Sequence, residues 1–520
     1  MKMFKNGYWQ KMVIILSILV ELGLVIAFVY LLTAGFLESS AGGWILLALW
    51  LVSIAVAIFA VNNDSGDEYK IVWLFMMAAF PVFGLIFYIM FAHKIRTKKE
   101  SRFLARYYAA LSHDPTTDET ARKLEAECPA AADVSHYIEQ ASESGAYTNS
   151  KVEYFPLGDV AFPVMLRELS KAKHYIFIEY FIITPGLFWD SILSILKEKV
   201  KEGVDVRVVY DDVGNLGSTP VHYYKRLREY GIKAYSFAKI KPVLDVRMNN
   251  RDHRKIMVID GHTCFTGGIN LADEYINHVQ KHGHWKDNSI MIKGKAVYGF
   301  TLLFLSNWVT SFEPKEKINY DHYRPETYID EDGGFPVSDG FVQPYGAMPY
   351  SNEEVGEGVY LSIMGKATNY AYISTPYLIL DEKLREAIRI AALQGTDVRI
   401  LVPGVPDKKL VFQLTKSNYG PLLQAGVKIY EYTPGFVHQK MVIVDDTMAT
   451  EGTINMDYRS LYLHLECGTF LAKNRAIGTM KQDFLDTIGV SHEVSFDEWK
   501  KWRKKRFVLW TLLRLVGPLL

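Results

Sequence analysis

The sequence of 520 residues contains few cysteines and has no excess of either charge. Its three cysteines, Cys128, Cys264 and Cys467, are too few and too far apart for a disulfide framework or a paired CxxC metal site, and this usage is typical of a reducing compartment. Lysine plus arginine and aspartate plus glutamate both number 58, so the formal net charge is zero. A chain-wide basic field for nucleic acid is therefore excluded, and any functional charge must be local.

Hydrophobic residues make up 49% of the chain and are concentrated at its beginning. Residues 12–34 are apolar apart from Glu21, and residues 44–61 and 71–92 contain no charged side chain. Each run is close to the roughly 20 residues that a helix needs to cross a bilayer. The sequence predicts two or three transmembrane helices in a membrane region at 1–93. A cleaved signal peptide is the alternative for the first run, but further apolar runs follow it and no clear cleavage site is present.

Charge around these runs predicts their orientation. By the positive-inside rule, a cluster of cations directly after the last run places the rest of the chain in the cytoplasm. Lys2, Lys5 and Lys11 also favour the inside, whereas three full spans would place the N-terminus outside, so the number of spans stays open. The cations after the last run are Lys94, Arg96, Lys98, Lys99, Arg102 and Arg106.

From about residue 150, short apolar strands alternate with amphipathic helices, which predicts an α/β fold. Blocks of this part occur twice in the same order, so we expect two tandem copies of one domain. GVDVRV at 203–208 returns as GTDVRI at 395–400, and LREYGIKAYSF at 227–237 returns as LLQAGVKIYEY at 422–432. The expected domains are a basic, helical connector at 94–150, repeats at 151–310 and 351–498, a linker at 311–350 and a C-terminal segment at 499–520.

Each repeat carries the same polar signature, H-x-K-x4-D followed by G-[GT]-I-N. One such motif alone would be weak, but two copies inside a longer repeat point to function. The signature residues are His253, Lys255, Asp260 and Asn270 in the first repeat and His438, Lys440, Asp445 and Asn455 in the second.

The spacing within this signature suggests phosphodiester chemistry. Residues i and i+2 of a strand share a face, so each histidine points the same way as its lysine, whereas each aspartate falls on the opposite parity and is expected to orient or fix a turn. Two histidines can exchange a phosphodiester if one attacks phosphorus and the other moves the alcohol proton. Lysine ammonium and asparagine amide groups would stabilise the phosphate charge in place of a metal. The histidines need carboxylate partners, for which Glu466, Asp287 and Glu179 are the candidates.

Three other histidines, His278, His282 and His284, lie close together in the first repeat. No carboxylate or cysteine stands at a matching spacing, and the second repeat has no counterpart. We therefore expect loop histidines there, and the sequence predicts neither a metal nor a cofactor.

These motifs resemble the phospholipase D superfamily and, within it, the bacterial cardiolipin synthases. The resemblance is carried by IEYFI at 178–182, NRDHRKIMVIDG at 250–261, GGINLADEY at 267–275, STPYLI at 374–379, HQKMVIVD at 438–445 and GTINMDYRS at 452–460. It implies that each repeat is a mixed sheet covered by helices and that the two histidines, lysines and aspartates form one shared site. It also implies a metal-independent transfer in which two phosphatidylglycerol molecules give cardiolipin and glycerol, through a phosphatidyl-histidine intermediate.

The sequence departs from this pattern in three places. Thr453 stands where a serine is common, Gln439 stands where a small residue is usual and would narrow the pocket, and one apolar N-terminal run is extra. The motifs do not distinguish a synthase from another phosphatidyltransferase or a phospholipase D-type hydrolase, nor do they say which histidine attacks, although repeat order favours His253. A nuclease and a non-catalytic scaffold are less well supported, because the chain has membrane runs and both motifs are intact.

The C-terminal segment also suggests a membrane substrate. Six cations among residues 500–506 precede an apolar tail, which is typical of an amphipathic helix on an anionic membrane surface. A basic helix that only packs on the domain is the alternative. Protein partners cannot be read from the sequence.

Overall fold

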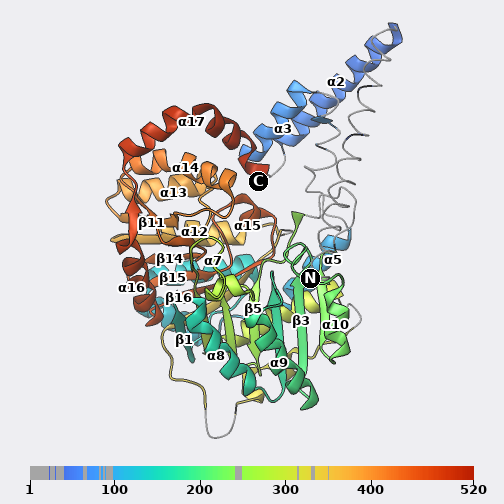
Figure 1. Cartoon of the computed structure of the whole chain (residues 1–520), viewed down its shortest axis with the longest axis vertical. Coiled ribbons are helices and arrows are strands. Elements are labelled where there is room, and N and C mark those ends of the chain that lie inside the picture. Colours follow the sequence, from blue (N-terminus) through green and yellow to red (C-terminus); the bar gives the residue numbers. More distant parts are fainter. Residues whose placement is uncertain are drawn as a thin grey trace.

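The computed structural model describes residues 40–62, 67–80, 98–239, 249–312, 316–329, 334–349 and 351–519, with a few single positions before residue 89. Figure 1 shows two α/β units in contact, with a pair of N-terminal helices extending from them. The predicted α/β fold with two mixed sheets flanked by helices is confirmed.

The first repeat is built on a seven-stranded sheet with the order β1-β8-β6-β5-β2-β3-β4. β2, β3 and β4 are parallel, and the other neighbours are antiparallel. The strands are β1 (Ser150–Phe155), β2 (Tyr175–Tyr180), β3 (Asp205–Asp211), β4 (Lys233–Phe237), β5 (Lys255–Ile259), β6 (Thr263–Gly267) and β8 (Ser289–Gly294). The helices are α8 (Gly158–Ser170), α9 (Leu187–Lys201), α10 (Tyr223–Glu229) and α11 (Val297–Asn307).

The second repeat has an eight-stranded sheet with the order β17-β12-β11-β10-β14-β15-β16-β9, which repeats the first order and adds β17 at one edge. Its strands are β9 (Phe341–Ala347), β10 (Tyr370–Ser374), β11 (Asp397–Pro403), β12 (Lys428–Tyr432), β14 (Met441–Val444), β15 (Met448–Gly452), β16 (Glu466–Ala472) and β17 (Ser491–Glu493). The helices are α12 (Val355–Met364), α13 (Glu382–Leu393), α14 (Lys409–Gln424), α15 (Tyr458–Tyr462) and α16 (Ala476–Gly489).

The central strands are buried on both faces because each sheet lies between two apolar layers. In β5, Ile256 and Val258 point into a core shared by both repeats, whereas Met257 and Ile259 point into a core beneath α8 and α9. This is the alternation that a strand imposes, and it explains why the motif strands are apolar at every position. Side chains of both motif strands, β5 and β14, contribute to this shared core.

Two elements differ from the expected domain boundaries. β9 lies inside the segment predicted as a linker, because its backbone pairs along its whole length with β16 and completes the second sheet. The connector contains the helices α5 (Lys98–Leu111), α6 (Asp118–Glu127) and α7 (Pro129–Ser142), of which α5 packs on α11 and α7 on α12. The connector therefore belongs to the folded body. The acidic stretch at 330–333 lies outside the described residues.

The N-terminal helices α2 (Ser40–Val61) and α3 (Asp67–Ala79) pack on each other. They leave large apolar side chains exposed, Trp44 and Ile71 among them. Within the part of the chain that the structure describes, no helix has both the length and the hydropathy of a membrane span. The first apolar run at 12–34, the end of the third run, and Lys94 and Arg96 lie almost entirely outside the described residues.

Candidate active site

The two motif histidines lie where the repeats exchange backbone contacts. The N–H of His253 donates to the carbonyl of Leu465 at 2.9 Å, and the N–H of His438 donates to the carbonyl of Lys286 at 2.7 Å. The second contact continues a short parallel pairing between β7 (His284–Lys286) and β13 (Gly435–Val437), and a bridge between Asp252 and Leu465 is the equivalent pairing on the other side. Each histidine therefore lies beside the residue that follows its contact in the other repeat. That residue is Glu466 for His253 and Asp287 for His438.

Those two residues are carboxylates, and each holds one histidine. The Nδ1 atom of His253 is 2.9 and 3.0 Å from the two Glu466 oxygens, and the Nδ1 atom of His438 is 2.6 Å from Asp287 Oδ2. Both histidines are 7% exposed, and both carboxylates are fully buried. A ring that donates from Nδ1 to a carboxylate keeps Nε2 as the basic, nucleophilic nitrogen. Burial lowers the pKa of both histidines well below the ordinary value, which favours this neutral form.

The two carboxylates have different surroundings. Burial alone would raise the pKa of Glu466, but the hydrogen bond from His253, with further support from His464, holds it well below its usual range. The Thr453 hydroxyl also donates to Glu466 at 2.5 Å. In contrast, burial raises the pKa of Asp287 to about 7, against the opposing charge of Lys440. The position equivalent to Thr453 is Gly268, where a Cβ would collide with Asp287 Oδ1, so only glycine leaves that carboxylate in place.

The two motif lysines are fully buried beside their histidines. The Lys255 ammonium donates to the His253 carbonyl at 2.5 Å, and the Lys440 ammonium donates to the His438 carbonyl. Burial lowers the pKa of Lys255 to about 8 and that of Lys440 to about 7. Two buried cations next to two neutral imidazoles make a site for a phosphate group.

These lysines lead to a prediction about pH. A lysine is charged below its pKa, so the phosphate-binding charge is lost as pH rises through about 7 to 8. We expect kcat/KM for the phospholipid substrate to fall over that range and also to fall on the acid side as Asp287, with a pKa of about 7, becomes protonated, which can be measured between roughly pH 5 and 9. Lys440→Arg, which stays charged, is expected to move the alkaline limb upward. A wild-type profile that is flat to the alkaline end would contradict the assignment.

The two motif aspartates lie apart from the histidines. Asp260 follows the far end of β5, and its carboxylate accepts backbone N–H bonds from Lys173, His174 and Tyr175 at 2.7–2.8 Å. Asp445 occupies the equivalent position after β14, where it accepts the same kind of bonds from the backbone at 368–370. The resemblance implied one shared site of six residues. The geometry brings together the histidines and lysines and leaves the aspartates fixing the start of a neighbouring strand.

The remaining motif positions also separate into two kinds. Asn270 is used internally, since its amide donates to the Tyr275 hydroxyl at 2.7 Å and its Oδ1 accepts from the Ile182 N–H at 3.1 Å. Asn455 is buried, and its Oδ1 has no hydrogen-bond partner among the described residues. Gln439 does not narrow the pocket as expected: it alternates to the other face of its strand and donates to Tyr154 and Asp483.

Two residues differ from what the sequence predicted for the site: the carboxylate of Glu179 and the imidazole of His464. Glu179 contacts no histidine in the described structure, because it pairs with the buried Arg254 at 2.6 Å and accepts from Asn307. His464 was missed by the sequence reasoning, although its ring centroid is 5.5 Å from that of His253 and its Nδ1 is 3.5 Å from Glu466 Oε1. The signal that could have found it is its position two residues before Glu466, on the same face of an extended segment.

Aromatic rings surround the two histidines unequally. The rings of Tyr275, Trp285 and Phe436 lie 5.5, 5.6 and 5.9 Å from that of His438. Trp285 and Phe436 come from β7 and β13, and their rings pack on each other at 4.9 Å. Among the described residues, the His253 ring has one such neighbour, Phe181, at 5.0 Å. The His438 side is therefore the more apolar side of the site.

One group of side chains has ligand atoms close enough to hold a metal ion within the described part of the chain. It consists of His253, His464 and Glu466, whose ligand atoms lie within 4.8 Å of one another. Two of these residues already form the histidine–carboxylate pair described above. His278, His282 and His284 form no such group among the described residues, and His284 Nδ1 lies 2.9 Å from the Tyr432 hydroxyl. That the reaction needs no metal stays a prediction.

Comparison with known proteins agrees with this architecture. Residues 165–297 and 360–488 match the family model described as the PLD-like domain of cardiolipin synthase, and residues 48–92 match the model described as the phospholipase D-nuclease N-terminal region. The chain is 34% identical to a cardiolipin synthase of Halalkalibacterium halodurans over 497 residues, which are 92% of this chain and 95% of that one. An uncharacterized protein of Streptococcus mutans is 41% identical over 474 residues, which are 90% of this chain and 100% of that one.

A solved structure supports the fold alone. The phosphatidylserine synthase of Haemophilus influenzae matches with a TM-score of 0.55 at 15% identity, over 75% of this chain and 100% of that chain. The sequence relatives and the two matched domains confirm the resemblance seen in the sequence. The chain therefore belongs to the cardiolipin synthase family of phospholipase D-like proteins.

Proposed function

We propose that the protein is a cardiolipin synthase, which transfers a phosphatidyl group between two phosphatidylglycerol molecules and releases glycerol. The observation that supports this proposal is the exchange of carboxylates between repeats, in which each motif histidine contacts a buried carboxylate of the other repeat and is followed, two positions on, by a buried motif lysine. Named relatives of similar length support the choice of substrate. The proposal includes no metal and no cofactor.

In the first step, the Nε2 atom of one histidine attacks the phosphorus of the first lipid. The P–O bond to the glycerol headgroup breaks, and the other histidine, which takes up a proton at Nε2 when the anionic lipid binds beside it, gives that proton to the departing glycerol oxygen. In the second step, that histidine takes the proton from a headgroup hydroxyl of the second lipid, whose oxygen attacks phosphorus and breaks the P–N bond. Lys255 and Lys440 stabilise the charge on the non-bridging oxygens in both steps, and the side-chain N–H of Asn455 donates a further hydrogen bond to them.

The protein has to favour a lipid alcohol over water in the second step, because water would give phosphatidic acid. The aromatic side of His438 supports such a preference, whichever of the two roles His438 takes, since apolar rings beside a reacting group exclude water. A phospholipase D-type hydrolase and a transferase with another acceptor are the alternatives.

This preference gives a testable prediction. We expect Trp285→Ala to raise the ratio of phosphatidic acid to cardiolipin by about tenfold, which corresponds to ~1.4 kcal/mol between the competing barriers. Trp285→Phe is the matched control, since it keeps a ring against Phe436 and is expected to keep the ratio near that of the wild type. An unchanged ratio in Trp285→Ala would show that these rings do not select the acceptor. The products are quantified by mass spectrometry.

We also propose that the protein works at the inner side of a bacterial cell membrane, with the N-terminal region as its anchor and both repeats in the cytoplasm. The apolar runs of that region and the large exposed apolar residues of α2 and α3 support an anchor. The basic residues that follow the runs support the orientation.

One experiment separates the candidate functions. The full chain, purified in detergent, is incubated with phosphatidylglycerol as the only lipid, with and without a chelator, and the products are identified by mass spectrometry. Cardiolipin and glycerol in both samples are expected. Phosphatidic acid alone would indicate hydrolysis, loss of activity with the chelator would contradict metal independence, and no turnover would reject phosphatidylglycerol as the only donor and acceptor.

A further inference from the structure

The last long helix of the chain, α17 (Phe496–Val516), packs along α14 by one face only. The indole N–H of Trp499 donates to the Lys416 carbonyl at 2.9 Å, and that of Trp510 donates to Gln413 at 3.1 Å. Gly420 of α14 leaves the space that the Trp499 ring fills, because a Cβ there would collide with it. These contacts fix which side of α17 faces outward.

The outward side is apolar at one end and cationic at the other. Phe507, Val508 and Leu512 are 56%, 68% and 58% exposed. Residues 499–520 contain seven lysines and arginines and no acidic side chain. Solvated apolar residues next to a cluster of cations are typical of a helix that lies on an anionic membrane surface.

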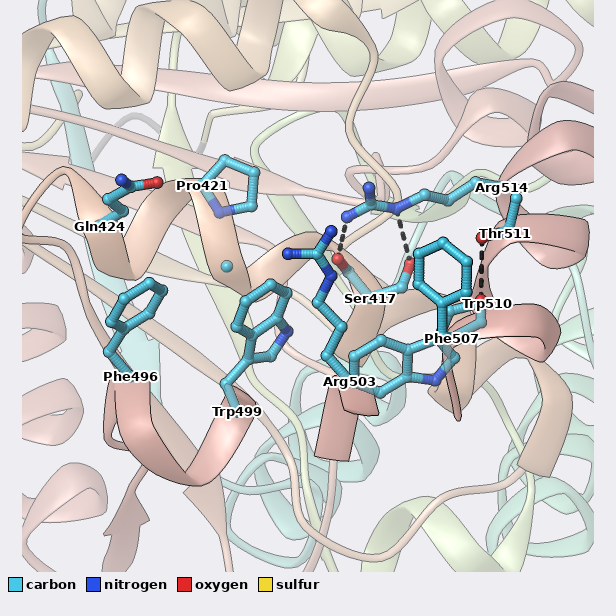
Figure 2. Close-up of a pocket in the computed structure, with 11 residues that line it drawn as sticks. Ser417, Pro421, Gln424, Phe496, Trp499, Arg503, Phe507, Trp510, Thr511 and Arg514 are labelled. Carbon is cyan, nitrogen blue, oxygen red and sulfur yellow. Dashed lines mark hydrogen bonds between the residues drawn. The ribbon is translucent and has the colours of Figure 1, made fainter. Parts of the chain in front are cut away.

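Two of these cations line a groove of about 210 Å³ between α14 and α17. Figure 2 shows the Arg503 and Arg514 side chains reaching toward Ser417, among the rings of Trp499, Trp510 and Phe507. Arg514 donates to the hydroxyl and the carbonyl of Ser417. Among the described residues, Arg503 lies over the Trp499 ring at 5.5 Å and forms no ion pair with a carboxylate.

The charges around the groove also favour the binding of an anion. Burial and the nearby charges of Arg385 and Arg503 lower the pKa of Arg514. The two guanidinium groups that line this groove repel each other until an anion binds between them. Arginine pairs well with phosphate oxygens.

The position of the groove suggests where that anion comes from. The turn after α17, η6 (Gly517–Leu519), packs on α3, so the C-terminal end of α17 lies next to the N-terminal helices, which carry exposed apolar side chains. Figure 1 shows the C-terminal end beside α3. We propose that the outer face of α17 and the Arg503–Arg514 groove together bind the phosphate groups of anionic phospholipids at the membrane surface, at a site separate from the histidine site.

The experiment uses the full chain in lipid nanodiscs and needs no turnover. Val508→Cys carries an environment-sensitive fluorophore, and the three native cysteines are buried and do not compete for the label. We expect a blue shift of the emission in phosphatidylcholine discs that contain phosphatidylserine, compared with phosphatidylcholine alone. The same label at Glu198→Cys, an exposed position of α9, is the control, and its emission is expected not to shift.

Charge removal tests the groove itself. Near an anionic surface each cation contributes about fivefold, so Arg503→Gln/Arg514→Gln is expected to lower the ratio of docked to undocked helix by roughly 30-fold. Arg503→Gln alone breaks no hydrogen bond to Ser417 and is expected to lower it by about fivefold. Lys201→Gln/Lys233→Gln removes the same charge from the first repeat and is expected to have no effect.

Three results would overturn the proposal. The first is an equal emission in both kinds of disc. The second is a groove variant that responds like the wild type. The third is a blue shift produced by inorganic phosphate on phosphatidylcholine discs, since that would assign the groove to a free anion. Because binding is read without catalysis, failure of this site and failure of the proposed reaction are distinguishable.

Discussion

Alanine at either His253 or His438 is expected to lower turnover by at least about 10⁴-fold, because one group forms the bond to phosphorus and the other moves the proton. Neither role can be taken over by the other histidine, since each ring is held by its own carboxylate. Product formation from phosphatidylglycerol, measured with the purified variants, checks this expectation.

The control for these variants is His278→Ala, a substitution at an exposed histidine of the first repeat, which is expected to keep wild-type turnover. The melting temperature of each variant shows whether the fold is retained. If either alanine variant folds and keeps turnover within tenfold of the wild type, its histidine is not part of the chemistry.

Substitution of the two carboxylates is expected to have the second largest effect on turnover. Glu466→Gln and Asp287→Asn should each reduce kcat by about 10²- to 10⁴-fold with little change in KM, because the amide no longer holds the histidine in its reactive tautomer. Glu466→Gln added to His253→Ala should cost little more, whereas Glu466→Gln combined with Asp287→Asn should lower kcat further. Steady-state kinetics of the single and double variants, with the exposed Glu153→Gln as a control, test this pairing.

The loss of activity caused by each of these two substitutions should also depend differently on pH. The pKa of Glu466 is far below neutral, so Glu466→Gln removes a charge at every working pH. The pKa of Asp287 is about 7, so below that pH the wild-type group is neutral, as asparagine is. The loss in Asp287→Asn should therefore grow as pH rises through 7. A large loss in Asp287→Asn that does not change with pH would reject this account of Asp287.

The sequence by itself determined the parts of the protein that depend on local pattern. The α/β fold, the two repeats and the shared direction of each histidine and lysine follow from strand alternation and from duplicated blocks. A turn-fixing role for Asp260 and Asp445 was also expected from parity, and the structure places both carboxylates on backbone N–H groups at strand starts.

Only the tertiary structure decided how the site is assembled. The sequence offered three candidate carboxylates, and position alone did not say that Glu466 serves His253, that Asp287 serves His438, or that Glu179 pairs with Arg254. The two histidine–carboxylate contacts join residues that are 213 and 151 positions apart. The alternation of side chains along one strand does not say which strand ends meet across two domains. That choice is made by the core shared between the sheets, which brings the end of one motif strand against the partner segment of the other repeat.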